Sequence, residues 1–505
     1  MNLIASTSTF GFFTLISRIL GYVRDILIAI FLGTSLFADA FFVAFRLPNT
    51  FRRLFAEGTF NAAFIPSYSG ELVKNKTDAD NFARSVFNLL FVILLFLVLI
   101  AEIFMPQLIF LIAPGFYKDP EKFNLAIILS RITFPFLFFV CLASFFGAIL
   151  NSYNKFAAAA AAPIILNVIL IGSLFIAQMI NISDVLVLSY AVSLAGFLQL
   201  IFLFFFVRKN FKVNLNIKVK VDEKIKFFFR KLLPSIFSSG VTQINILVGT
   251  IIASFQAGAV SYLYYADRVY QINLAVAGIA VGTVMLPELS KNIKNNNFDK
   301  AFDLQNRALE LCLFLSVPAA FALYLASEQI ISSLFGYGSF DKESVTNTAI
   351  ALTFFSFGVP AFSILKIFSN FFFARNDTKT PFYLSVVSVI LNIAISISFF
   401  GRFGFVIIPI ATSISSWLNV LMYYYFIKRR NLHTFDSKFI YKLPRIILSV
   451  VVMGILLHLL LGFFSDKFNY NESWKFIYLF IIVTLSLISY FIISNFSGAF
   501  KFKDI

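Results

Sequence analysis

The sequence holds little of what catalytic and metal-binding proteins use. Its 505 residues include only two cysteines and two histidines. Cys141 and Cys312 lie far apart inside apolar runs, and neither His433 nor His458 has a carboxylate or cysteine at ligand spacing. There is also no nucleotide-binding loop, paired-carboxylate arrangement or nucleophile with its base. We therefore expect no metal, no cofactor, no disulfide framework and no enzyme.

Charge is also scarce, at 13% of residues, whereas 59% are apolar. Apolar runs repeatedly reach the ~20 residues that cross a bilayer, and the alternation typical of outer-membrane strands is absent. Aromatic residues make up 18% of the chain and are mostly Phe, which suits helices facing lipid. The composition predicts an all-α polytopic membrane protein. The net charge of +16 does not indicate nucleic acid, because no soluble module exists to bind it.

The apolar runs predict about fourteen transmembrane helices. The first, second and eighth are the weakest, because they carry charges. The predicted spans are 8–32, 36–62, 84–112, 124–150, 157–179, 185–207, 229–254, 262–289, 304–326, 345–373, 381–400, 404–427, 443–463 and 475–495.

The loops between these spans alternate in charge. The connector from Val207 to Lys231 holds nine Lys and Arg residues against two acidic ones, and loops of the other parity are short and nearly neutral. Under the positive-inside rule the basic loops and both termini lie in the cytoplasm.

The chain also contains a duplication. Matching residues recur in order at offsets of 221, 225, 222 and 225: Pro66 with Pro287, Pro135 with Pro360, Asn154 with Asn376, and Asn167 with Asn392. Six spans per copy make the copies parallel, a plan known in transporters. We predict an N-lobe over 1–207, a basic cytoplasmic linker over 208–228, a C-lobe over 229–428 and two C-terminal helices within 429–505.

The second span carries a polar stripe. In DAFFVAFRLPNTFRRLFAE, Asp39, Arg46 and Arg53 recur every seven residues, and Asn49 and Glu57 lie four residues either side of Arg53. Each such charge in mid-bilayer costs roughly 2.5–3.5 kcal/mol. The stripe should therefore face a watery cavity or a polar ligand, and Pro48 within it predicts a bend.

Three other spans add polar residues. The first carries Arg18, Arg24 and Asp25, and the eighth carries Asp267, Arg268 and Gln271 after a tyrosine cluster. The seventh has a small polar face that includes Thr242 and Asn245. Bland alternatives exist: Arg24, Arg52 and Arg53 could snorkel to the interface, the tyrosines could form an interfacial belt, and small polar faces often pack helices.

An excess of arginine suits a phosphate or pyrophosphate better than a neutral or cationic solute. Without an ATP-binding loop, energy must come from an ion gradient, the membrane potential or consumption of the product.

The chain resembles the MurJ (MviN) lipid II flippases of the MOP exporter superfamily. The motifs that carry the resemblance are SRILGYVRD (17–25), ADAFFVAFRLPNTFRRLFAEGTFNAAFIP (38–66), APGF (113–116), YYADRVYQ (264–271) and NDTKTP (376–381). It implies two six-helix lobes plus two C-terminal helices with a groove for the polyprenyl tail. It places the essential cavity charges at Arg18, Arg24, Asp39, Arg52, Arg53, Glu57, Asp267 and Arg268.

The resemblance implies that the chain moves lipid II, the undecaprenyl-pyrophosphate-linked disaccharide-pentapeptide, to the periplasmic leaflet of the bacterial inner membrane for peptidoglycan synthesis. Its partners would be lipid II, membrane lipids and candidate proteins of cell-wall synthesis. Gln271 stands at a family position often held by Glu, so the charge role of that position is not carried over. The resemblance also implies that some members bind sodium through an acidic residue on the seventh span, but this chain has no carboxylate between Leu232 and Val260. We therefore do not expect sodium coupling and favour the membrane potential as the source of energy.

Alternating access is the mechanism we expect, with the arginines holding the headgroup and Asp39 and Glu57 pairing with them when the site is empty. Two alternatives remain: an exporter of another polyprenyl-linked saccharide, and a multidrug exporter.

Overall fold

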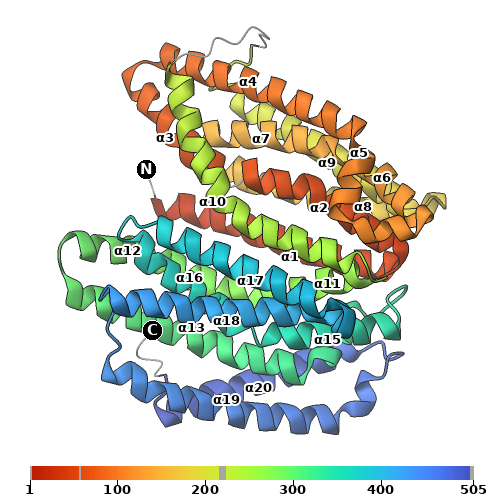
Figure 1. Cartoon of the computed structure of the whole chain (residues 1–505), viewed down its shortest axis with the longest axis vertical. Helices are drawn as coiled ribbons and strands as arrows, with labels where there is room; N and C mark the ends of the chain where they lie inside the picture. Colours follow the sequence, from red (N-terminus) through yellow and green to blue (C-terminus); the bar gives the residue numbers. More distant parts are fainter. Residues whose placement is uncertain (1–2, 56–58, 215–222, 501–505) are drawn as a thin grey trace. The chain divides into compact units, whose positions relative to one another are not determined.

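The computed structural model describes residues 3–55, 59–214 and 223–500, and all the regular secondary structure in these ranges is helical (Figure 1). Contacts divide the chain into two compact units, Met1–Val260 and Ser261–Ile505. Each unit is described by itself below.

Unit 1 is built from long helices, and four of its elements begin with a proline in their first turn. α1 lies against α8, α7 and α8 both lie against α9, and α2 lies against α6. Its elements are α1 (Leu3–Leu32), α2 (Leu36–Phe55), α3 (Thr59–Lys74), α4 (Lys76–Ile103), α5 (Met105–Ile112), the 3-10 turn η1 (Pro114–Lys118), α6 (Pro120–Thr133), α7 (Pro135–Ser152), α8 (Phe156–Ile180), α9 (Asp184–Val207) and α10 (Glu223–Ala253).

Unit 2 repeats much of this plan and adds two helices. α17 lies beside α18, α13 contacts α16 and α19, and α19 packs on α20. Its elements are α11 (Ala259–Leu274), the π-helical segment η2 (Ala275–Ala280), α12 (Val281–Lys294), α13 (Phe298–Leu325), α14 (Ser327–Phe335), α15 (Lys342–Ser356), α16 (Val359–Phe373), α17 (Lys379–Phe403), η3 (Gly404–Val406), α18 (Ile407–Arg429), α19 (Ser437–Phe463), η4 (Ser465–Phe468) and α20 (Lys475–Ser497).

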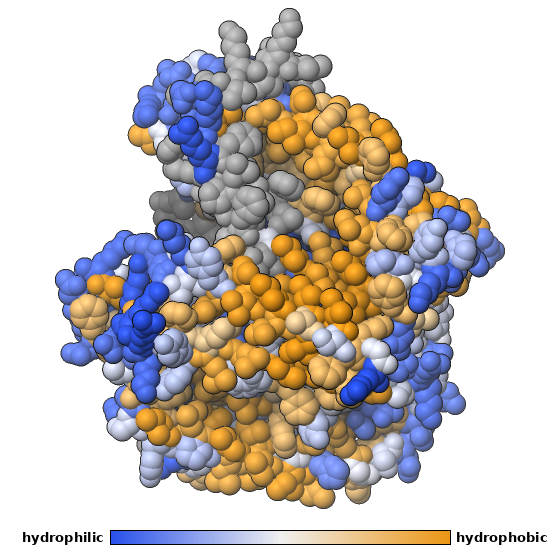
Figure 2. Space-filling view, viewed as in Figure 1, coloured by the Kyte–Doolittle hydropathy of each residue, from blue (hydrophilic) through white to orange (hydrophobic). Residues whose placement is uncertain are grey.

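Each of the fourteen predicted spans coincides with a helix or with a broken pair of helices. By length and hydropathy alone, the described residues contain nine candidate spans, or ten if α15 and α16, bent by 43°, count as one. The lower number has physical causes. The charged α1 and α2 are not among the candidates, and one 51-residue candidate combines α17 with its neighbour α18. Large apolar side chains such as Phe96 and Phe480 are exposed, and Figure 2 shows wide hydrophobic areas, as lipid contact requires.

The residues that marked the duplication occupy equivalent places in the two units. Pro135 and Pro360 stand in the first turns of α7 and α16, each directly after a break in a helix. Asn154 and Asn376 follow these two helices, and both have φ of 59°. Asparagine is one of the few residues that adopt the left-handed region readily. The same turn chemistry in both copies supports the internal repeat.

α10 packs on helices of unit 1. It contacts α2, α3, α4 and α5, and the contact-based division between the units falls after Val260. Aromatic packing provides one reason for these contacts, since the ring of Phe228 lies edge-on to Phe60 and Phe64 of α3. The lobe that we predict to begin at residue 229 stays a prediction.

The C-terminal helices are fastened to unit 2 by polar contacts as well as by packing. Lys442 of α19 forms an ion pair with Glu310 of α13 at 2.5 Å, and the Tyr490 hydroxyl of α20 donates to the carbonyl of Phe314 at 2.8 Å. The part-buried ion pair and the buried hydrogen bond fix the two added helices against α13.

His433, in the connection between α18 and α19, is a buried part of the same attachment. Its Nδ1 lies 2.9 Å from the Gln305 Oε1, and it packs on the rings of Phe371 and Phe435. Burial lowers the pKa of His433 from 6.5 to about 4; Asp436 opposes this and Arg375 reinforces it.

Acid is therefore expected to loosen this connection. Between these two pKa values the unfolded chain binds more protons, so the stabilising contribution is present above pH 6.5 and is lost as the pH falls toward 4. The loss amounts to about 3 kcal/mol. Thermal unfolding in detergent at pH 7 and pH 4.5 measures it, and His433→Gln should remove most of the difference. An equal pH dependence in both proteins would contradict this assignment.

Candidate functional site

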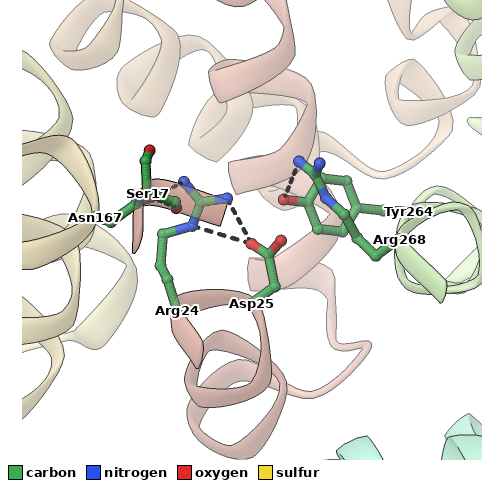
Figure 3. Close-up of polar contacts among 6 residues, drawn as sticks. All are labelled: Ser17, Arg24, Asp25, Asn167, Tyr264 and Arg268. Atoms are coloured by element: carbon green, nitrogen blue, oxygen red, sulfur yellow. Dashed lines mark hydrogen bonds and ion pairs between the residues drawn. The ribbon is translucent and has the colours of Figure 1, made fainter. Parts of the chain in front are cut away.

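Arg24 lies in the C-terminal third of α1 and is buried by contacts within unit 1 (Figure 3). Its Nε and Nη2 donate to the Oδ1 of Asp25 at 3.0 and 2.7 Å, and its Nη1 donates to the Oδ1 of Asn167 at 3.0 Å. Asn167 in turn donates to the carbonyl of Ser17 at 2.8 Å. The guanidinium is thus neutralised by its neighbour in sequence and ties α1 to α8, which is more than interfacial snorkelling would provide.

The other predicted cations of unit 1 lie on α1 and α2. Arg18 is exposed, whereas Arg52 and Arg53 are half-buried. The Nε of Arg52 donates to the Oδ1 of Asn49 at 3.1 Å, one turn earlier on α2. Glu57 lies outside the described residues.

Asp39 does not face an open cavity in this conformation, in contrast to the expectation from the stripe. Its side chain is 0% exposed, and its Oδ2 accepts from the Nζ of Lys122 at 2.6 Å and from the backbone N–H of Gly258 at 2.9 Å. The Lys122 ammonium also lies 4.2 Å from the centre of the Phe116 ring. Asp39 therefore joins α2 to the start of α6 and to the segment that follows α10.

Arg46 faces α10. Its Nη1 donates to the hydroxyl of Thr250, and the hydroxyl of Thr50 donates to the Arg46 carbonyl at 3.0 Å. The side chain is half-buried. In this conformation the contact gives Arg46 a packing role between two helices of unit 1.

The APGF motif forms η1 and contacts the same segment after α10. The backbone N–H of Gly115 donates to the hydroxyl of Ser254 at 2.9 Å. A Cβ added at Gly115 would lie 2.3 Å from the backbone C and O of Ser254, so no larger residue fits without a shift of the backbone. Asp39, Lys122 and Gly115 together hold residues 254–258, which we call the α10 connector.

In unit 2, Arg268 is half-buried on α11 (Figure 3). Its Nη2 donates to the Tyr264 hydroxyl at 3.0 Å, and the guanidinium lies 4.8 Å from the centre of the same ring. The Gln271 amide donates to the carboxylate of Asp267. Tyr264 thus positions an arginine and is not only part of an interfacial belt, whereas Tyr265 is fully buried against Phe335.

The remaining predicted residues lie on α10. Asn245 is half-buried, and Thr242 belongs to the same helix, although its side chain lies outside the described part. Among the residues that the structure describes, no group of three or more His, Cys, Asp and Glu could hold a metal ion.

Asp25, Lys122 and Asn167 complete this picture, although none was predicted as a site residue. Asp25 shares a helix face with Arg18, and Asn167 marked the repeat, so both gave a signal. No feature of the sequence indicated Lys122, because it stands in a polar segment outside the predicted fourth span.

Comparison with known proteins decides the family. The model of the lipid II flippase MurJ family matches residues 28–480. This chain belongs to that family. A probable lipid II flippase MurJ of Rhizobium meliloti is 40% identical over 464 residues, covering 91% of this chain and 86% of the relative. A probable lipid II flippase MurJ of Rickettsia prowazekii is 38% identical over 477 residues, covering 94% of this chain and 93% of the relative. The family consists of bacterial multi-pass membrane transporters rather than enzymes, which confirms the resemblance found in the motifs.

Solved structures agree with this membership. A lipid II flippase MurJ in an inward closed conformation superposes with a TM-score of 0.82 at 30% identity, over 96% of this chain and 98% of that chain. A MATE-family multidrug transporter of the MOP superfamily, in an inward-facing conformation, gives a TM-score of 0.69 at 15% identity, over 82% of this chain and 94% of that chain. The second likeness concerns the fold alone, and it confirms the predicted all-α architecture.

Proposed function

We propose that this chain is a lipid II flippase. It carries the undecaprenyl-pyrophosphate-linked disaccharide-pentapeptide from the cytoplasmic to the periplasmic leaflet of the bacterial inner membrane, by alternating access. The observation that carries the proposal is membership of the MurJ family over residues 28–480, a range that includes the motifs at 38–66 and 264–271 with Arg52, Arg53 and Arg268.

The chain would cross the inner membrane many times, with both termini in the cytoplasm. The basic connectors support this orientation, above all residues 207–231 with nine Lys and Arg. The predicted division into lobes at 1–207 and 229–428, with linker 208–228 and C-terminal helices within 429–505, belongs to the same proposal. Candidate protein partners come from the cell-wall synthesis machinery.

Arginines carried by each unit bind the pyrophosphate and the carboxylates of the headgroup. Arg18, Arg24, Arg52 and Arg53 serve in unit 1, and Arg268 serves in unit 2. Arg24 and Arg268 support this role because their donors are already aligned on oxygen acceptors, Asp25 and the Tyr264 hydroxyl. A phosphate oxygen can replace either acceptor and gain a charge-assisted bond.

Asp25 acts as the counter-ion of Arg24 while the site is empty, a role that the sequence had assigned to Asp39 and Glu57. Its contact with Arg24 keeps the buried charge paired, because an unpaired buried guanidinium would be expensive. Asp39 instead fastens the α10 connector, and its contacts would have to change when the transport cycle moves α10.

The membrane potential drives the cycle. No ATP-binding loop exists in the sequence, and the absence of a carboxylate between Leu232 and Val260 argues against a sodium site on α10. A net transfer of charge with the substrate would respond to the potential at about 2.3 kcal/mol per charge per 100 mV.

Replacing single arginines tests the site. Arg24→Ala and Arg268→Ala should each abolish growth rescue of a flippase-depleted bacterium, although immunoblots of membranes show normal amounts of protein. Arg307→Ala is the matched control, because Arg307 is an exposed surface arginine paired with Asp303. Full rescue by both site variants would remove these residues from the mechanism.

A further inference from the structure

Lys366 is a second cation of unit 2 that the sequence did not single out. It lies at the centre of α16, seven residues from Val359 and seven from Phe373. Its side chain is exposed. Within the described part of the chain, no hydrogen bond or ion pair holds its ammonium group, in contrast to Arg24 and Arg268.

A lysine at this depth does not reach water by snorkelling toward the cytoplasmic end of its helix. Seven residues of helix correspond to about 10 Å. Side chains also lean toward the N-terminus of a helix, which for α16 is the direction away from the basic cytoplasmic loop that follows Phe373. Facing lipid, the charge would cost roughly 2.5–3.5 kcal/mol. The position therefore needs a hydrated surface or an anion.

The stem of Lys366 is held beside an unusual segment of backbone. A Cβ added at Gly278, in the π-helical η2, would lie 3.1 Å from the Cα of Ser363 and 3.5 Å from the Cγ of Lys366. One turn further, the Asn370 amide donates to the carbonyl of Gly282 at 2.7 Å. π-helical segments are rare and frequently mark functional sites. The contacts fix the base of the side chain and leave its charged end unengaged.

The same stretch of chain leads to the polar residues of α11. Gln271, which binds Asp267, precedes Gly278 by seven residues, or about 10 Å along the helix. Lys366 therefore adds a positive charge two turns further toward the cytoplasmic end of the polar group formed by Asp267, Arg268 and Gln271. All of these residues belong to unit 2.

We propose that Lys366 binds an oxyanion of the transported headgroup, either the pyrophosphate or a peptide carboxylate, on the cytoplasmic half of unit 2. The inference rests on the proposed flippase function. An ammonium is a compact point charge with three rotatable donors, whereas Arg268 offers a fixed fork. Such a group suits a contact that is made and released as the headgroup moves.

Cysteine chemistry tests the charge directly. In a full-length chain with Cys141→Ala and Cys312→Ala, Lys366→Cys should reduce lipid II flipping in proteoliposomes by about tenfold or more, the effect of one lost charge-assisted bond. Aminoethyl methanethiosulfonate restores an amine and should recover flipping, whereas the sulfonatoethyl reagent should not. Ser369→Cys, on the next turn of α16, is the matched control and should flip normally before and after either reagent.

Binding assays separate the two oxyanions. If Lys366→Gln weakens binding of both lipid II and undecaprenyl pyrophosphate, the contact is with pyrophosphate; if it weakens only lipid II, the contact is with a peptide carboxylate. Normal flipping and normal binding by the Lys366 variants, beside an active parent protein, would overturn the inference and leave the proposed function intact. An inactive parent would instead refute the proposed function.

Discussion

Lys122→Met is expected to abolish transport and to destabilise unit 1 strongly. The substitution leaves Asp39 buried at 0% exposure without its cation, while the Gly258 N–H remains as one donor to it. Removing one partner of a buried ion pair costs about 3–5 kcal/mol. Thermal unfolding in detergent and lipid II flipping in proteoliposomes measure the two effects.

A double substitution distinguishes the effect of the ion pair on stability from the effects of its two residues taken singly. Asp39→Asn with Lys122→Met removes both charges, so this protein should be markedly more stable than Lys122→Met alone. Transport should stay low, because the carboxylate no longer holds the α10 connector. Lys76→Met is the control: Lys76 is an exposed lysine at the start of α4 in unit 1, and its loss should change stability little. If Lys122→Met were as stable as the double variant, the ion pair would not matter.

Gly115→Ala is expected to have the second large effect. The added Cβ would lie 2.3 Å from the backbone of Ser254, and backbone cannot move aside as a flexible side chain can. The α10 connector must then shift and lose the hydrogen bond from the Gly115 N–H to the Ser254 hydroxyl. We expect the rate of flipping to fall by about tenfold or more, which corresponds to an activation barrier raised by about 1.4 kcal/mol. The assay is the same flipping measurement in proteoliposomes.

Gly172→Ala provides the matched control for this experiment. Gly172 also lies in unit 1, within α8, but an added Cβ there meets no atom within 4 Å. Alanine is also the better helix former. Flipping by the two alanine variants at equal rates would show that the close approach at Gly115 is dispensable.

Most of the fold could be predicted from the sequence, because hydropathy and helix breakers act locally. Apolar runs placed the spans, and Pro135, Pro360, Asn154 and Asn376 marked equivalent breaks and turns. The packing of α10 could not be predicted, since the contacts of Phe228 with Phe60 join residues far apart in the chain. The repeat offsets fixed the order of helices but not which neighbours each helix contacts.

The candidate site was predictable in its residues and not in its pairings. Helical periodicity identified Arg24 and Asp39 as polar groups in membrane helices, because it reports which residues share a face. It does not report partners on other helices. Arg24 binds Asn167 of α8, and Asp39 binds Lys122 of α6, a residue without any sequence signal. Lys366 was overlooked for a similar reason, since it is a single charge in an otherwise apolar helix.

The most direct test of lipid II transport by this chain measures in which leaflet of the membrane lipid II lies. In cells that depend on this chain for growth, a periplasmic enzyme that cleaves lipid II reports the fraction in the outer leaflet. Lipid II is expected to become accessible with the unchanged chain and to stay in the cytoplasmic leaflet with Arg24→Ala or Arg268→Ala. Lipid II that is equally accessible after depletion of the chain would contradict the central claim, and would favour another polyprenyl-linked cargo.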